Sequence, residues 1–374
     1  MLKYIISIIL FFLSFYAFGD DFIYYSNKNY KITGTEVSKF NKPWSMVFLN
    51  KKKILVTTME GDLWLLDTNG RKIKVKNVPK TFYGGQGGLG DIKIDLDFKN
   101  NSRIFFSTVE SSDGGKTRGS SLYSAKLLFS PSPTLTEIKC IWKQYPRVEG
   151  LGHFSQKIVI PPSNSVHRDK IFITSGDRRK SEIVQNLRNS LGKIIRINVD
   201  GTTPKDNPFK YKYARNIWTL GHRNVLGIAF DKNGNLWASE MGPKHGDEFN
   251  LIKKGKNYGW PKVSEGNHYD GRLIPKHKSN KFFLSPAISW TPSIAPSSFI
   301  IYQGNQFSDW KNKAVLAALK GKSLIIINLQ EPIKEIERVL IGERVRDIKQ
   351  SPNGEIWILK DGINGALIKL NKKL

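Results

Sequence analysis

The chain contains very little cysteine, since Cys140 is the only one among 374 residues. An internal disulfide is therefore excluded, and the folded protein must be stabilised by core burial or by bound metal. Acidic residues are also few, with 32 Asp and Glu against 59 Lys and Arg. No long apolar run follows the first residues, so we expect no stable membrane insertion of the mature chain.

The excess of basic residues gives a formal net charge of +27, which is typical of nucleic-acid-binding proteins. Here, however, the lysines are spread over the whole chain and often occupy turns, as at 51–53 and 253–254. We therefore expect no nucleic-acid partner. Most of this charge is interpreted as a solvated surface, with attraction to anionic membrane or polysaccharide.

The first nineteen residues have the features of a secretory signal peptide. A short basic start is followed by an apolar run from Ile5 to Leu13, and Ala17-Phe18-Gly19 fits a small-x-small cleavage site. An uncleaved membrane anchor is the alternative. The pattern predicts a periplasmic or secreted protein in which residues 20–374 form a single domain.

The chain also lacks any long helical period, whereas strand-length apolar runs recur between turn signals. About six of them share a turn residue followed by an aliphatic or aromatic strand. They are 62–67, 103–107, 170–174, 235–239, 323–327 and 355–359. This number favours an all-β fold, a six-bladed β-propeller of four-stranded blades. A large β-sandwich or two β domains are the alternatives.

The segment 242–260, GPKHGDEFNLIKKGKNYGW, is rich in hard oxygen donors. A Gly-Pro turn can point two carbonyls the same way, and the adjacent carboxylates of Asp247 and Glu248 follow it. Ca²⁺ takes about six to eight such oxygens. The alternative is an ordinary polar turn before a strand.

Four more segments have distinctive residues but little specificity when taken singly. A lone histidine such as His153 is more often a packing or surface residue. Arg344 and Arg346 alternate along a strand and so point to one face, which solvent alone could explain. The other two are the glycine-rich loop 84–90, which lacks P-loop spacing, and the segment 217–224 with Arg223 and Asn224.

Taken together, in their order and spacing, these motifs resemble the pyrroloquinoline quinone (PQQ) dependent sugar dehydrogenases, soluble glucose dehydrogenase and the aldose sugar dehydrogenases. The resemblance covers about 40–370, and the segments 221–229, 242–260 and 290–297 (WTPSIAPS) are the most specific. It implies a six-bladed propeller with PQQ in a cleft at one end. It also implies oxidation of the anomeric carbon of an aldose to a lactone, with electrons leaving to a quinone or cytochrome.

The resemblance assigns catalytic and substrate roles. His153 matches the general base that takes the proton of the C1 hydroxyl. Arg223, together with Asn224, matches the pair near the reactive carbonyls of PQQ, where a cation would stabilise developing charge. Gln86 matches a substrate-side glutamine, and Trp290 is expected on the same side.

The resemblance also assigns cofactor and metal ligands. Since PQQ carries three carboxylates, a ring of basic residues is physically reasonable. The expected PQQ contacts besides Arg223 and Asn224 are Lys320, Arg344, Arg346 and Gln185. The expected calcium ligands are the Gly242 and Pro243 carbonyls for the ion that coordinates PQQ, and Glu248 and Tyr258, with Asp247 beside them, for a second, structural ion.

The sequence departs from the family pattern around the expected base. Gly152 stands where soluble glucose dehydrogenase has an aspartate that helps to bind sugar, and 154–157 replaces a glycine-rich segment ending in arginine. Two other functions remain as alternatives, a calcium-dependent propeller lactonase and a non-enzymatic binding propeller. A lactonase would need no ring of cations for a polyanionic cofactor.

Overall fold

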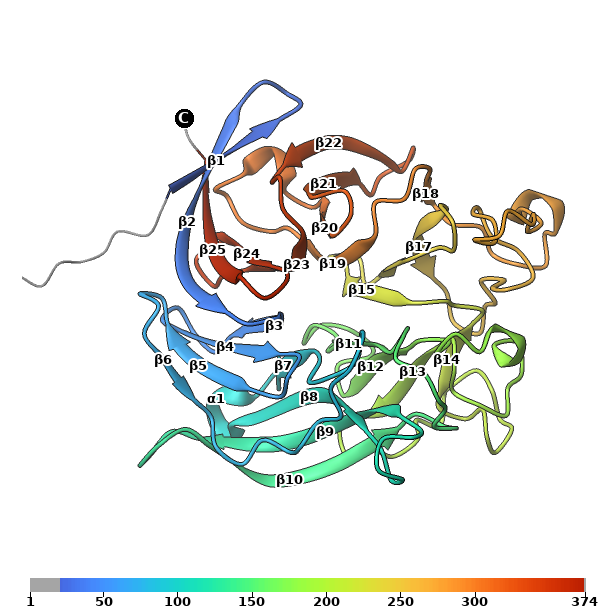
Figure 1. The fold of residues 1–374 in the computed structure, drawn as a ribbon, viewed down its shortest axis with the longest axis horizontal. Helices are drawn as coiled ribbons and strands as arrows, with labels where there is room; N and C mark the ends of the chain where they lie inside the picture. The colour runs from blue at the N-terminus through green and yellow to red at the C-terminus, as the bar shows by residue number, and fades with distance from the viewer. Residues whose placement is uncertain (1–20, 373–374) are drawn as a thin grey trace, which may run out of the picture.

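A computed structural model describes residues 21–372 of the protein, and the predicted signal peptide lies outside these residues. Antiparallel β-sheets are arranged in a ring around a central axis (Figure 1). The described residues include one short α-helix, α1 (Phe98–Asn101), and three 3₁₀ turns, Ser181–Ile183, His277–Ser279 and Ser308–Trp310. The expected all-β propeller arrangement is therefore confirmed. None of the described helices is long and apolar enough to cross a membrane.

Four of the sheets have four strands each, which pair in chain order. The first contains β3 (Pro43–Phe48), β4 (Lys53–Thr58), β5 (Leu63–Asp67) and β6 (Lys72–Lys74). The second contains β7 (Ile92–Ile94), β8 (Arg103–Glu110), β9 (Gly119–Leu128) and β10 (Thr134–Lys143). The third contains β11 (Ser155–Val159), β12 (Lys170–Ser175), β13 (Lys193–Asn198) and β14 (Ile217–Leu220). The fourth contains β15 (Val225–Phe230), β16 (Leu236–Glu240), β17 (Asp247–Ile252) and β18 (Ile288–Trp290).

The rest of the ring is one nine-stranded sheet, so six separate blades are not what the structure shows. Its order is β19-β20-β21-β22-β1-β2-β25-β24-β23. One half contains β19 (Pro296–Ile301), β20 (Ala314–Ala318), β21 (Ser323–Asn328) and β22 (Lys334–Leu340). The other strands are β1 (Asp21–Ser26), β2 (Lys31–Phe40), β23 (Val345–Gln350), β24 (Ile356–Lys360) and β25 (Gly365–Lys372). The two halves join because β1 pairs with β22 at Tyr25–Leu340 and Ser26–Val339.

The ring is closed by pairing between the two ends of the described chain. Strand β2 lies beside β25, from Ile32 opposite Lys372 to Phe40 opposite Gly365. Figure 1 shows the blue N-terminal strands against the red C-terminal ones. A propeller opens if its first and last strands separate. The backbone hydrogen bonds between β2 and β25 therefore hold the ring closed without a disulfide.

The recurring sequence pattern identified real strands. The six predicted runs correspond to β5, β8, β12, β16, β21 and β24. One falls in each four-stranded sheet and two fall in the nine-stranded sheet. They are the middle strands of their sheets, which pack on both faces and therefore carry the most apolar residues. For example, Leu55 and Leu65 of the first sheet pack with Ile104 and Leu127 of the second.

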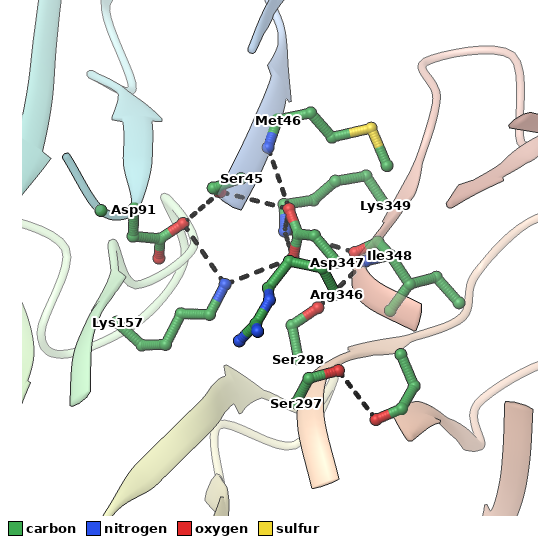
Figure 2. A network of polar contacts seen from close by, with 12 residues as sticks. Ser45, Met46, Asp91, Lys157, Ser297, Ser298, Arg346, Asp347, Ile348 and Lys349 are labelled. Atoms are coloured by element: carbon green, nitrogen blue, oxygen red, sulfur yellow. Dashed lines mark hydrogen bonds and ion pairs between the residues drawn. The ribbon is translucent and has the colours of Figure 1, made fainter. Parts of the chain in front are cut away.

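Six strands face the central axis and follow one another around it: β3, β7, β11, β15, β19 and β23. A buried charge network ties four of these positions together (Figure 2). Asp347 on β23 accepts hydrogen bonds from the Met46 amide at 2.9 Å and from Lys157 at 3.3 Å. Burial would raise the pKa of Asp347, but the ammonium groups of Lys157 and Lys349 hold it well below its usual range. The axis is thus fixed by charge pairs as well as by apolar packing.

Candidate active site

A cavity of about 580 Å³ lies at one end of the ring. It is lined by aromatic, amide and charged side chains, the mixture usual in small-molecule sites. Its lining includes Lys42, Trp44, Tyr83, Gln86, Phe154, Ser155, Asn224, Met241, Lys320, Arg344, Arg346 and Asp361.

The antiparallel pairing explains why these residues meet. Residues such as Trp44, Asn224 and Arg346 lie at or just before the beginning of inner strands, whereas Lys320 and Asp361 follow β20 and β24, which pair with the inner strands β19 and β23. The start of one strand and the end of its antiparallel neighbour lie at the same edge of a sheet. The ring arrangement then brings these edges together around one cavity.

His153, the expected base, is nearly buried beside this cavity and is held by two partners. Its Nδ1 lies 2.7 Å from Oδ1 of Asp177, and its backbone amide donates to Oε1 of Gln86 at 2.8 Å. Trp260 Nε1 donates to the other oxygen of Asp177 at 2.8 Å. An Nδ1–H that donates to Asp177 leaves Nε2 as the free acceptor, which is the tautomer a general base needs.

The electrostatic surroundings favour the neutral form of this imidazole. Burial lowers the pKa of His153 below its ordinary value of 6.5, and the cations of Arg223 and Arg179 add to that effect. The carboxylate of Asp177 acts in the opposite direction. A neutral imidazole near pH 7 can accept a proton, so the geometry and the charge state agree.

The backbone around His153 is held in a strained conformation. His153, Ser155 and Gln156 have φ of 52°, 61° and 71°, a left-handed region that costs non-glycine residues energy. Arg178 offsets that strain: its buried guanidinium donates to the carbonyls of Gly152 at 2.9 Å and of Gly150 at 2.5 Å. It also stacks on the Phe154 ring at 3.6 Å. Arg178 therefore holds the loop that carries His153 in this conformation.

Arg223 and Asn224 lie between this loop and the Gly-Pro turn. The Arg223 guanidinium donates to the carbonyl of Gly242 at 2.6 Å and lies 5.4 Å from the Trp260 ring. Asn224 lines the cavity and accepts from Ser155 Oγ at 3.1 Å. Both residues thus lie beside the His153 loop, and their contacts with PQQ stay a prediction.

The expected basic ring forms the opposite part of the lining. Arg344 and Arg346 each donate to Asp361, at 2.8 and 2.9 Å, and their cations hold the pKa of that carboxyl below its ordinary value although burial would raise it. Arg346 also lies 4.5 Å from the Trp44 ring. Lys320 lines the same cavity with an exposed side chain. Several cations therefore surround the one carboxylate in the lining.

Two buried donors near the cavity lack an acceptor among the described residues. They are Nε1 of Trp44 and Nε of Arg223. A buried N–H without an acceptor costs ~1–3 kcal/mol, so such atoms point to a missing acceptor. A ligand rich in carboxylate and carbonyl oxygens would supply it.

The expected calcium segment contains a buried acidic pair. Glu248 lies near Glu240, and Asn250 Nδ2 donates to both, at 3.1 and 3.3 Å. Burial, reinforced by the charge of Glu240, raises the pKa of Glu248 well above its ordinary value. Both carboxylates line a small cavity of about 10 Å³ together with Gly242 and Pro243. Among residues 21–372, no group of three His, Cys, Asp or Glu side chains has the geometry of a metal site.

The other expected metal ligands are engaged elsewhere. Asp247 Oδ2 accepts from the amides of Ile294 and Ala295 at 2.8 and 2.7 Å, which ties the WTPSIAPS segment to the Gly-Pro turn. The Tyr258 hydroxyl donates to the Leu251 carbonyl at 2.6 Å. Their assignment as calcium ligands stays a prediction.

Gln185 and Trp290 do not line the cavity. Gln185 donates to the Trp260 carbonyl at 2.6 Å and so supports the segment after the calcium motif. Trp290 is buried at the end of β18, where its Nε1 donates to Glu335 at 2.9 Å. Their direct contacts with PQQ and substrate remain predictions.

Sequence reasoning missed several residues of this site. Asp177, Arg178, Trp260, Trp44 and Asp361 all contact predicted site residues. Asp177 could have been suspected, because it is an acidic residue just after a predicted strand. Its pairing with His153 depends on strand register, which the sequence pattern does not give.

The fold and cavity define a class of protein, a β-propeller with a cationic end cavity and a carboxylate-oriented histidine. The sequence model of the Glucose / Sorbosone dehydrogenase family matches residues 40–369, and the chain belongs to that family.

Individual relatives agree with this assignment. The chain is 33% identical over 346 residues to the aldose sugar dehydrogenase YliI of Escherichia coli, covering 90% of this chain and 91% of the relative. It is 27% identical over 421 residues to quinoprotein glucose dehydrogenase B of Acinetobacter calcoaceticus, covering 86% and 85%. The crystal structure of the soluble aldose sugar dehydrogenase of Escherichia coli in its apo form matches with a TM-score of 0.85 and 29% identity, covering 91% and 100%.

Proposed function

We propose that this protein is an exported PQQ- and calcium-dependent dehydrogenase that oxidises the anomeric carbon of aldose sugars to lactones. The observation that carries the proposal is a cavity with a wall of cations and, directly beside it, a His153 that Asp177 orients and whose pKa burial lowers. The similarity to aldose sugar dehydrogenases supports sugar oxidation as the reaction class.

The lining fits PQQ on chemical grounds. Lys320, Arg344 and Arg346 would hold carboxylates, since charge-assisted pairs are the strong hydrogen bonds of proteins. The orphaned N–H groups of Trp44 and Arg223 call for an acceptor-rich ligand. Bound PQQ would supply a two-electron acceptor for the hydride from C1.

The residues of this chain would then perform the proton transfer. Nε2 of His153 takes the proton of the C1 hydroxyl, while Asp177 fixes the tautomer and stabilises the imidazolium that forms. Gln86 accepts a hydrogen bond from the backbone amide of His153, which helps to position the base, and it also lines the cavity. Arg178 keeps the loop in its left-handed conformation, so that the base does not need to reorganise during the reaction.

Calcium fits the Gly-Pro turn for a different reason. Two buried carboxylates, Glu240 and Glu248, share one small cavity with Gly242 and Pro243, and the guanidinium of Arg223, which also lines it, donates to backbone carbonyls. A divalent ion would remove the cost of that like-charge pair. We infer that Glu248 is a ligand and that the Gly242 carbonyl, which now accepts from Arg223, becomes available when PQQ engages Arg223.

The remaining features of the proposal concern the fold and location. Counting each half of the nine-stranded sheet as one unit makes six blades, with β1 as an outer bridge. The leader in residues 1–19 supports a periplasmic or secreted location, and an external quinone or cytochrome would take the electrons.

The test is reconstitution of purified apoprotein with PQQ and Ca²⁺, followed by assay on a panel of aldoses with an artificial electron acceptor. We expect lactone formation that requires both PQQ and Ca²⁺. Hydrolysis of added lactones without PQQ would instead identify a lactonase. Absence of PQQ binding at the cavity would indicate a binding propeller.

A further inference from the structure

Arg179 lies beside the base and has no role in the proposed chemistry. Its backbone amide donates to Oδ1 of Asp177 at 2.8 Å, the same oxygen that lies 2.7 Å from Nδ1 of His153. The start of the Arg179 side chain is therefore within a few ångströms of the imidazole. A guanidinium on so long a side chain can reach the far end of a pyranose whose C1 hydroxyl contacts His153.

The side chain of Arg179 lies over a glycine on the His153 loop. A Cβ built on Gly152 would stand 2.6 Å from Nε and 3.2 Å from Cζ of Arg179. Any side chain at position 152 would therefore displace the guanidinium. The glycine leaves a place for this cation directly next to the base.

The Arg179 guanidinium is exposed and has no hydrogen bond or ion pair with another side chain in the part of the chain that the structure describes. The neighbouring Arg178 differs in its burial and its contacts. It is buried, and its guanidinium donates to backbone carbonyls. A free cation next to the loop that carries the base is available for an anionic ligand.

Arg179 is separated from Arg344 and Arg346, two of the cations expected to hold PQQ. Arg346 belongs to β23 and Arg344 directly precedes it, whereas Arg179 follows β12 of the sheet whose inner strand is β11. Around the axis, β3 and β7 stand between β23 and β11 on one side, and β15 and β19 on the other. Arg344 and Arg346 therefore lie on the part of the ring opposite to Arg179.

We propose that Arg179 is a specificity determinant that selects aldoses carrying an anionic group remote from C1, a uronic acid or a sugar phosphate. This inference rests on the proposed function for its reaction. The reaction itself is unchanged: hydride leaves C1 for the quinone cofactor, the hydroxyl proton goes to His153, and the anionic group stays intact on the lactone product.

The test compares sugars that differ only at C6, namely D-glucose, D-glucuronate and D-glucose 6-phosphate, with reconstituted holoenzyme. We expect kcat/KM to be at least about 10-fold higher for one of the anionic sugars, because a charge-assisted contact is worth ~1.5–3 kcal/mol. The better of the two identifies the carboxylate or the phosphate as the preferred group. The preference should fall as salt is raised.

Arg179→Gln should lower the anionic-to-neutral ratio by about 10-fold or more, and Arg179→Lys should restore part of it. Arg188→Gln is the matched control, since this exposed arginine lines a separate cavity beside Tyr145 and Tyr213. A parent enzyme that prefers glucose, or a ratio unchanged in Arg179→Gln, would overturn the proposal. So would a loss of PQQ affinity in Arg179→Gln as large as that in Arg346→Ala, because it would make Arg179 a cofactor ligand.

A second measurement separates this inference from the proposed function. D-glucuronate and D-glucose 6-phosphate are titrated into cofactor-free protein while the ¹⁵N resonance of the Arg179 Nε–H is followed, with Arg179→Lys for assignment. A shift with either anion and none with glucose supports the contact even if no aldose is oxidised. No shift with either anion overturns it, even if neutral aldoses are good substrates.

Discussion

Asp177 and His153 form a buried pair beside the cavity, with Oδ1 of the carboxylate 2.7 Å from Nδ1 of the imidazole. Asp177 also accepts from the Arg179 amide and from Trp260, so three elements depend on one buried side chain. Asp177 orients the base, and through Trp260 it joins the His153 loop to the segment that ends the calcium motif.

The first prediction concerns this orientation. Asp177→Asn should keep the fold and PQQ binding but lower kcat by ~10²–10⁴-fold, because an amide can stabilise the wrong imidazole tautomer. Single-turnover reduction of bound PQQ by an aldose is the measurement. A variant that reduces PQQ at the parental rate would show that Asp177 does not set the tautomer.

The second prediction separates the two histidines. His153→Ala should bind PQQ nearly as the parent does and lose turnover by ~10²–10⁴-fold. His222 is fully buried, with Thr219 Oγ1 2.9 Å from Nε2 and Glu240 2.8 Å from Nδ1. His222→Ala should therefore lower the free energy of unfolding, by ~1–3 kcal/mol for the unsatisfied partners, and cost less turnover.

Melting curves and single-turnover rates on both histidine variants test this assignment. Rapid PQQ reduction by His153→Ala would remove His153 as the base. A His222→Ala variant with parental stability but no turnover would reverse the two roles.

The third prediction uses the pKa of His153 in the cofactor-free protein. We expect it to titrate below 6.5, since burial and two arginines disfavour the imidazolium. Asp177→Asn removes the carboxylate that favours the charged form and should lower the pKa further. Arg179→Gln removes an opposing cation and should raise it. Imidazole NMR titration measures all three proteins, and shifts of the opposite sign would contradict this charge arrangement.

In turnover, the same argument predicts an acid limb. Activity should be retained at neutral pH and be lost as the pH falls through the pKa of His153, because a protonated imidazole cannot accept the C1 hydroxyl proton. His153→Ala should not show this limb.

The fourth prediction concerns the basic wall. Arg346→Ala should weaken PQQ binding by ~1.5–3 kcal/mol, the range for charge-assisted hydrogen bonds. Arg344→Ala should cost less, because its side chain is 49% exposed and solvent screens it. Titration of apoprotein with PQQ gives both affinities. Equal binding by parent and Arg346→Ala would place the cofactor elsewhere.

The sequence predicted the repeated strands and the basic and acidic motifs, because both are local patterns. Apolar runs such as 170–174 must be buried on both faces, and they become middle strands of the sheets. The role of β1 as a bridge to β22 was missed, since it depends on only two residue pairs far apart in sequence.

The contacts of the site were harder to predict than its members. Asp361 lies 15 residues beyond Arg346 and Asp177 lies 24 beyond His153, and each pair meets only through the register of two antiparallel strands. Trp290 belongs to a distinctive motif, and the structure packs its ring in the core with Phe249, so its expected contact with substrate stays a prediction. Sequence motifs therefore locate the site, while strand register decides which side chains face each other.

The fifth prediction is that Ca²⁺ stabilises the protein even without PQQ. The chain has a single cysteine and buries Glu248 beside Glu240, so ion binding to the native state should raise its free energy of unfolding by ~2.7 kcal/mol at a Ca²⁺ concentration 100-fold above Kd. Glu248→Gln removes one charge of the pair. In chelator this variant should melt no lower than the parent, because like-charge repulsion is relieved, but added Ca²⁺ should no longer raise its melting temperature.

Glu137→Gln, on the surface and 64% exposed, is the control and should respond as the parent does. A parent melting curve that is the same in chelator and in Ca²⁺ would exclude a structural calcium ion, and a Glu248→Gln variant that still responds to Ca²⁺ would move the site away from this carboxylate.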